Sequence, residues 1–197
     1  MPMAAQDNPT AVAGPKDRIL EATIALMKQT GLTGAGINQI LARSGAPKGS
    51  LYYYFPGGKE QITREALTLY AERVAAAFDR VLSSKKKPAD KIRALFLFVA
   101  DRFEGGSFEQ SCAVGAVTLD LNTDDSGIRA VAATAFASWR TVIARHLPVS
   151  SAKRRFALAG LVLSTIEGAY VRGRADHSKQ AFVEAGEWLA LLVQQVE

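Results

Sequence analysis

The hydrophobic residues of this chain recur almost throughout with the spacing of one helical face. Between residues 19 and 27 they follow the i, i+3, i+4, i+7 pattern, which places them on one side of an α-helix. Pro15 suits the first turn of this helix, and Gly31 follows its last periodic residue as a stop signal. Because the alternation typical of a β-strand is not found, the pattern predicts an all-α fold.

Breaks in the periodicity divide the rest of the chain into further helices. Two short ones are predicted over 37–44 and 47–55, with Gly45 and Pro47 at the break between them. Longer patterns predict helices over about 59–82, 88–104, 112–121, 128–147, 151–174 and 178–196. Residues 1–14 are small and polar without periodicity, and we expect them to form a flexible N-terminal arm.

The two short helices over 37–55 have the form of a helix-turn-helix unit, whose second helix can enter the major groove of DNA. Leu51 and Phe55 lie four residues apart and predict the inward face of that second helix. Its other faces then carry Lys48, Ser50, Tyr52 and Tyr53. An exposed tyrosine offers a hydroxyl to phosphate and a flat ring to sugar or a thymine methyl, while Gly49 lets backbone N–H groups approach a phosphate.

A plain helical hairpin, with its tyrosines packed on a neighbouring helix, is the alternative to a DNA-binding unit. The sequence favours DNA binding because the helix over 18–27 joins the two short ones in a three-helix unit, and the third helix carries the polar aromatic residues. No Ser/His/Asp, paired-carboxylate or glycine-rich phosphate-binding pattern is found, so the sequence does not predict an enzyme. A helical small-molecule-binding protein without DNA affinity is the remaining alternative.

The composition changes this picture modestly. The 197 residues carry 24 Lys and Arg against 19 Asp and Glu, a net charge of +5 that permits a nucleic-acid partner. Residues 1–64 hold seven basic and four acidic side chains, so the positive charge is concentrated around the helix-turn-helix unit. A single cysteine and two histidines predict neither a disulfide nor a structural metal site, and we expect no cofactor. Without a signal-peptide or membrane-spanning pattern, we expect a cytoplasmic protein that has no membrane partner.

The segment GAPKGSLYYYF over 45–55, followed by Lys59 and Glu60, resembles the DNA-binding signature of TetR/AcrR-family transcriptional regulators. The segments GINQIL, FPGGKE, SCAVGAV and IEGA, which begin at residues 36, 55, 111 and 166, are similar to a narrower branch, the LmrA/YxaF-like regulators. Two positions differ from the usual family pattern. Ala35 stands where Thr or Ser often begins the second helix, which leaves Thr33 as the nearest hydroxyl, and Tyr54 stands where His is common.

The resemblance implies a helix-turn-helix DNA-binding domain over 15–62 and a helical-bundle domain for effector binding and dimerisation over 63–197. It implies a homodimer that binds double-stranded operator DNA and leaves a palindromic operator when a small-molecule effector binds. We expect a repressor, although an activator is left open. By motif position, the DNA contacts fall on Thr33, Lys48, Gly49, Ser50, Tyr52, Tyr53, Tyr54 and Lys59.

The larger domain offers candidates for effector binding. A subset of its aromatic residues is expected to line a pocket between helices, and the others form core. The candidates are Phe96, Phe103, Phe136, Trp139 and Tyr170. Glu167 lies in an otherwise apolar helix, where it either accepts a hydrogen bond from the effector or is held by Arg172 or Arg174. Cys112, between small and apolar neighbours, is expected to be a buried hydrophobic residue.

The last two helices are candidates for the dimer interface. By resemblance they pair with those of a second copy as a four-helix bundle, and their small residues permit close approach of helices. The candidate residues are Leu158, Leu161, Thr165, Phe182, Gly186 and Leu189. The alternative is that these helices only close the core of the monomer.

Overall fold

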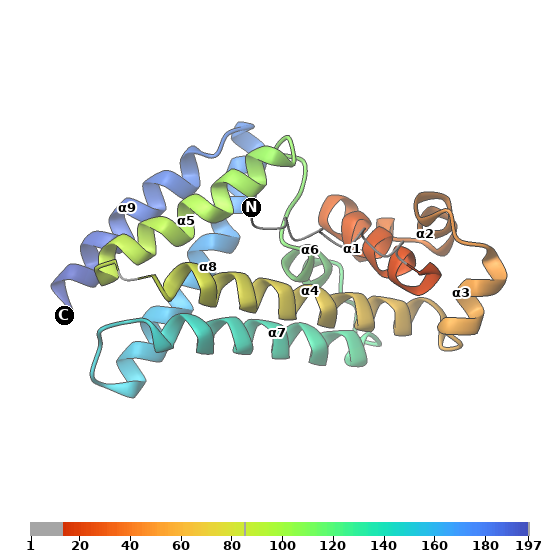
Figure 1. Ribbon diagram of the computed structural model, residues 1–197, viewed down its shortest axis with the longest axis horizontal. Coiled ribbons are helices and arrows are strands. Elements are labelled where there is room, and N and C mark those ends of the chain that lie inside the picture. Colours follow the sequence, from red (N-terminus) through yellow and green to blue (C-terminus); the bar gives the residue numbers. More distant parts are fainter. Residues whose placement is uncertain (1–13, 85, 197) are drawn as a thin grey trace, which may run out of the picture.

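The computed structural model describes residues 14–84 and 86–196, and every regular element in that part of the chain is an α-helix (Figure 1). The helices are α1 (Pro15–Gly34), α2 (Ile37–Ser44), α3 (Lys48–Tyr54), α4 (Gly58–Leu82), α5 (Pro88–Gly105), α6 (Ala113–Leu119), α7 (Ser126–Arg145), α8 (Ala152–Asp176) and α9 (Gln180–Gln195). The all-α prediction is confirmed. Apart from Gly14, the arm predicted over 1–14 lies outside the described residues.

The end of α1 differs from the prediction. The helix continues past Gly31 to Gly34, but Gly31 itself has a φ of 66°, a left-handed conformation that interrupts the helix. A Cβ atom at this position would overlap Oδ2 of Asp120 at the end of α6. The same Oδ2 atom accepts a hydrogen bond of 3.0 Å from the Thr33 backbone N–H. The glycine therefore allows the end of α1 to dock against α6.

Helices α1, α2 and α3 form a small unit around a shared apolar centre. Leu51 and Phe55 have no exposed surface, which confirms the inward face predicted for α3. They lie in the core with Ile19 and Met27 of α1, because a four-residue spacing keeps both side chains on one side of the helix. Helix α2 ends at Gly45, whose φ of 61° lets its N–H return to the Leu41 carbonyl at 3.1 Å.

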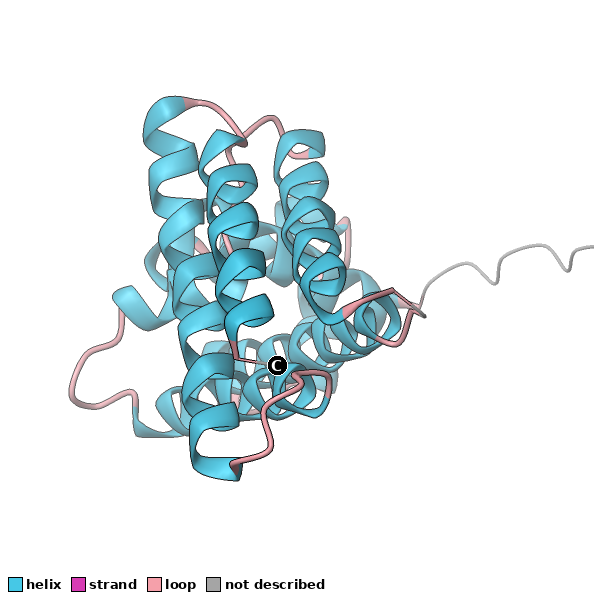
Figure 2. Ribbon diagram, turned by 90° about the vertical axis from the view of Figure 1, so that its left-hand side faces the viewer, coloured by secondary structure: helices cyan, strands magenta, loops and turns pink. Residues whose placement is uncertain are grey.

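Helix α4 connects this unit to the rest of the molecule. Figure 1 shows α1–α3 gathered at one end and α4 running from there to the opposite end, with α7 lying alongside it. The indole N–H of Trp139 on α7 donates to the Ala71 carbonyl of α4 at 2.9 Å. Seen from the end opposite α3, the larger domain is a bundle of helices joined by loops (Figure 2). Among the described helices, none is both long and apolar enough to cross a membrane.

Helix α9 packs closely against α5. A Cβ atom at Gly186 would lie 2.8 Å from Cβ of Phe96, so only a residue without a side chain allows this approach. The close approach at Gly186 is therefore made to α5 of the same chain. A Cβ atom at Gly168 would meet no atom within 4 Å, which places this glycine on an open face of α8.

Candidate functional sites

The outer face of α3 carries an exposed group of polar and aromatic residues. Tyr53 is 79% exposed and Tyr52 is 49% exposed, while Lys48 and Gly49 are also exposed and Ser50 is half-buried. Burial of Leu51 and Phe55 on the opposite side turns these residues outward. The arrangement presents an ammonium group, hydroxyls and flat rings on one short helix, which are the groups that contact phosphates and base edges.

Tyr54 has a different setting from the two tyrosines before it. It is half-buried and packs against the core, and its ring meets that of Tyr53 edge to face at a centroid distance of 5.0 Å. This contact restricts the Tyr53 ring, so Tyr54 acts as a support for its exposed neighbour.

Two further predicted DNA contacts take part in the junction between helices. The ammonium group of Lys59 donates to the Leu32 carbonyl at 2.8 Å, which ties the start of α4 to the end of α1. Thr33 is exposed, and its backbone N–H is occupied by Asp120. It lies at the end of α1, whereas the residue that precedes α2 as its N-cap is Gly36.

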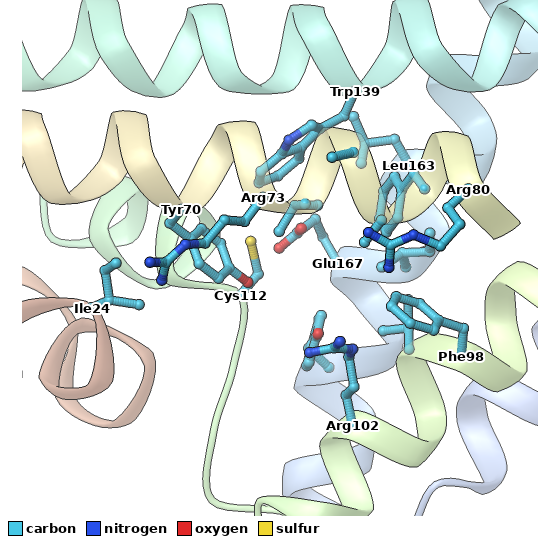
Figure 3. A pocket seen from close by; sticks show the side chains of 17 residues that line it. Ile24, Tyr70, Arg73, Arg80, Phe98, Arg102, Cys112, Trp139, Leu163 and Glu167 are labelled. Atoms are coloured by element: carbon cyan, nitrogen blue, oxygen red, sulfur yellow. The ribbon is translucent and has the colours of Figure 1, made fainter. Parts of the chain in front are cut away.

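A cavity of about 470 Å³ lies among α1, α4, α5, α7 and α8 (Figure 3). This volume falls within the range of small-molecule sites. Its walls are mainly apolar and aromatic, and the residues include Tyr70, Phe78, Phe98, Trp139, Leu163 and Tyr170. Trp139 meets Tyr70 and Phe78 at centroid distances of 6.2 and 6.3 Å, so its indole ring forms a wall between α4 and α7.

The structure separates the predicted effector residues into two groups. Trp139, Glu167 and Tyr170 line this cavity, and Phe136 lines two adjoining hollows together with Glu167. Phe96 and Phe103 do not line it. Phe96 is buried against α9, and Phe103 is buried in an aromatic cluster with Phe108, Tyr170 and Phe182, because both side chains point from α5 toward α9.

Glu167 is the one acidic residue among the described residues that line the cavity. Neither arginine considered from the sequence holds it: Arg172 pairs with Asp176 and Glu184, and Arg174 donates to the Ser111 hydroxyl. A Cβ atom at Gly115 would overlap Glu167 Oε2, so α6 lies directly against the carboxyl group. Burial raises the pKa of Glu167 to about 7, and a hydrogen bond with Cys112 lowers it only in part.

Several cavity residues were missed from the sequence. Arg73 and Arg80 of α4 and Arg102 of α5 surround the cavity with Tyr70 and Cys112 (Figure 3). In the sequence, an arginine that borders a cavity cannot be distinguished from one that faces only solvent. No sequence pattern therefore identified these three arginines. The burial predicted for Cys112 is confirmed, and that burial raises the pKa of its thiol well above the ordinary value.

The predicted dimer residues also divide into two groups. Phe182, Gly186 and Leu189 are buried in the core of the monomer, since this face of α9 packs on α5. Leu158 and Thr165 are half-buried, and Leu161 is exposed on α8. The apolar residues that remain exposed on α9 are Trp188, at 74%, and Leu191.

A helix-turn-helix unit with an exposed polar and aromatic face, joined by one long helix to a larger helical bundle, is the architecture of a DNA-binding transcriptional regulator. The chain belongs to the TetR family of bacterial regulatory proteins, whose family profile matches residues 19–66. Residues 88–188 match the C-terminal domain of LmrA/YxaF-like transcriptional regulators. Both families consist of regulators, so the chain is not an enzyme.

Individual relatives agree with this assignment. The uncharacterised HTH-type regulator YxaF of Bacillus subtilis is 29% identical over 182 residues, which cover 91% of this chain and 95% of YxaF. The HTH-type regulator LmrA of the same organism is 32% identical over 132 residues, covering 67% of this chain and 70% of LmrA.

Solved structures share the fold. A TetR regulator from Legionella pneumophila superposes with a TM-score of 0.83 at 17% identity, covering 95% of this chain and 100% of the other. A cysteine mutant of the TetR-family regulator CifR, solved with 26-bp operator DNA, gives a TM-score of 0.78 at 17% identity, covering 93% and 98%.

Proposed function

We propose that this regulator is a cytoplasmic repressor that binds a palindromic operator as a homodimer and leaves it when a small-molecule effector fills the cavity. The observation that carries this proposal is the continuity of α4. Its first turn is tied to the DNA-binding unit through Lys59, and its middle forms a wall of the cavity through Tyr70. A ligand that moves α4 therefore acts on the position of α3.

The DNA contacts in this proposal come from the exposed face of α3. Tyr53 supplies its ring and hydroxyl to the major groove, Lys48 and Tyr52 contact phosphates or base edges, and the Gly49 backbone approaches a phosphate. Ser50 lies beside them with its hydroxyl. Tyr54, Thr33 and Lys59 support this surface from the junction.

The proposed homodimer uses the exposed faces of α8 and α9. A tryptophan that is 74% exposed, with Leu161 and Leu191 also open to solvent, is an apolar surface of the kind that a second copy covers. A two-fold arrangement would present two α3 helices to successive major grooves, about 34–36 Å apart, and this symmetry matches a palindromic operator.

Effector binding changes operator affinity only if the two conformations of the dimer bind the effector differently. The contact of the cavity with Ile24 of α1, as well as with α4, supports such a difference. A change in cavity shape then displaces α1, a helix of the DNA-binding unit, directly.

The test is DNA binding by Lys48→Ala and Tyr53→Ala, with Lys153→Ala as the matched control. Lys153 is exposed at the start of α8, so its replacement removes the same charge outside the DNA-binding unit. The duplex is selected from randomised DNA by the purified parent protein. We expect both α3 variants to lose at least tenfold in affinity, with unchanged circular dichroism and oligomeric state.

The salt dependence separates the two contacts. Lys48→Ala should reduce the slope of log affinity against log salt by about one for each protomer, whereas Tyr53→Ala should leave this slope nearly unchanged. Parent-like affinity in both variants would refute the assigned surface. If the parent protein selects no duplex but binds small molecules, a sequestering protein replaces the repressor.

A further inference from the structure

The open side of the cavity carries three arginines, Arg73, Arg80 and Arg102, whose guanidinium groups surround the aromatic interior (Figure 3). All three side chains are exposed. Within the described part of the chain, neither Arg80 nor Arg102 has a carboxylate within the 4.0 Å of an ion pair. The guanidinium group of Arg102 lies 4.7 Å from the Phe98 ring centroid, and this contact holds it beside the cavity.

Charge is thus distributed unevenly over this site. Three permanently positive groups lie at the rim, and Glu167 is the acidic group among the described lining residues. Because the pKa of Glu167 is raised to about 7, its carboxyl group is only partly ionised at neutral pH. The rim therefore attracts an anion, while the interior accepts aromatic or aliphatic groups and one hydrogen-bond donor.

We propose that the effector is a hydrophobic organic anion, whose apolar part fills the aromatic cavity and whose carboxylate, sulfonate or phosphate ester binds Arg73, Arg80 and Arg102. We further propose that the anion replaces Glu21 of α1 as the ion-pair partner of Arg73. Both statements rest on the proposed function and name the effector class and the contact that transmits its binding.

The ion pair of Arg73 connects the cavity with the DNA-binding unit. Nη2 of Arg73 lies 2.5 Å from Oε1 of Glu21, which lies on α1. A second ion pair, between Lys16 and Glu65, also joins α1 to α4, but neither of its residues lines the cavity. Arg73 can thus form an ion pair either with a carboxylate of α1 or with an anion at the rim. When it pairs with the anion, the ion pair between α1 and α4 is lost.

The expected effect is limited by exposure. Both side chains of the Arg73–Glu21 pair are about half exposed, at 52% and 50%. An ion pair in such a setting changes an equilibrium by about two- to fivefold. We therefore expect the transfer of Arg73 to change operator affinity by about this factor for each protomer.

Anion binding is tested with two fluorescent probes that share one ring system. 8-Anilino-1-naphthalenesulfonate carries a sulfonate, and N-phenyl-1-naphthylamine is the same scaffold without it. Arg73→Gln, Arg80→Gln and Arg102→Gln should each weaken binding of the sulfonate about two- to fivefold and leave the neutral probe unchanged. Arg172→Gln, an exposed arginine of α8 outside the cavity, is the matched control and should change neither. Equal loss of both probes, or no loss of the sulfonate, would overturn the anion site.

The switch is tested by reversing the charges of the pair. Glu21→Arg and Arg73→Glu each place like charges together, and each should weaken binding to the selected duplex without any probe present. The double variant restores an opposite pair and should regain operator affinity. It should nevertheless lose the response to the sulfonate probe, because a carboxylate now stands at the rim.

The outcomes separate the two levels of the proposal. A double variant that still releases the duplex with the sulfonate probe as the parent does would overturn the Arg73 switch, as would a double variant that fails to recover affinity. If the parent binds no duplex, the proposed repressor and its switch both fall, while the anion site is still decided by the probe titrations.

Discussion

Replacing Glu167 with glutamine should stabilise the folded protein in alkaline solution and change little in acid. The carboxyl group lies against α6 in the cavity wall, with the Cys112 thiol as its hydrogen-bond partner and no cation pairing with it among the described residues. Burial without a compensating cation disfavours the ionised form, and this raises the pKa of Glu167 from its ordinary 4.5 to about 7. Glutamine keeps the shape and removes the ionisation.

The sign and size follow from proton linkage. Below pH 4.5 the carboxyl group is protonated in both the folded and the unfolded state, so it favours neither. Between pH 4.5 and about 7 the unfolded chain has released the proton that the folded state still holds, so stability falls over this range and levels off above it, where both states are ionised. Since a tenfold change in proton affinity corresponds to about 1.4 kcal/mol, the full loss is about 3 kcal/mol.

The assay is urea unfolding of the parent and Glu167→Gln proteins at about pH 5 and about pH 8.5. Protein concentration is held constant because dimer formation adds to apparent stability. The difference between the two proteins should grow in favour of the variant by about 2–3 kcal/mol over this range. Glu109→Gln, which alters an exposed carboxylate outside the cavity, is the matched control for removing one carboxyl group. A constant difference for Glu167→Gln would refute the proposed burial of its charge.

Four further substitutions test packing and assembly. Gly186→Ala should lower the free energy of unfolding by about 1–3 kcal/mol, because the new Cβ atom meets Phe96. Gly168→Ala, on the open face of α8, should raise the free energy of unfolding by up to about 1 kcal/mol. Equal urea midpoints for the two variants would contradict this difference in packing. Gly31→Ala should cost about 1–3 kcal/mol and lower the Tm, since a φ of 66° and Asp120 both oppose a side chain; an unchanged Tm would speak against that strain. Trp188→Asp should yield a folded monomer in sedimentation velocity, and a persistent dimer would exclude this face as the interface.

Local patterns were sufficient for the helices and for the inward face of α3. The spacing of apolar residues depends only on the helical repeat, so it predicted that Leu51 and Phe55 would be buried and Tyr53 exposed, as found. The stop signal at Gly31 was also local, although the helix resumes after it. The reason for a glycine at this position was not local. The left-handed turn at Gly31 accommodates Asp120, which lies far away in the sequence.

The cavity was only partly predictable. An aromatic residue on an apolar helix face has the same pattern whether it borders a cavity or fills the core. Phe96 and Phe103 therefore looked like Trp139 and Tyr170 until the packing of α5 on α9 separated them.

The sequence by itself determined the helices, the exposed chemistry of α3 and, through its motifs, the family. Each of these depends on residues close together along the chain. The tertiary structure alone decided which apolar face of α9 turns inward, leaving Trp188 outside, and which arginines surround the cavity. It alone brought Arg73 to Glu21. These outcomes depend on how helices distant in sequence cross and rotate against one another, and a one-dimensional pattern of polar and apolar residues does not specify those angles.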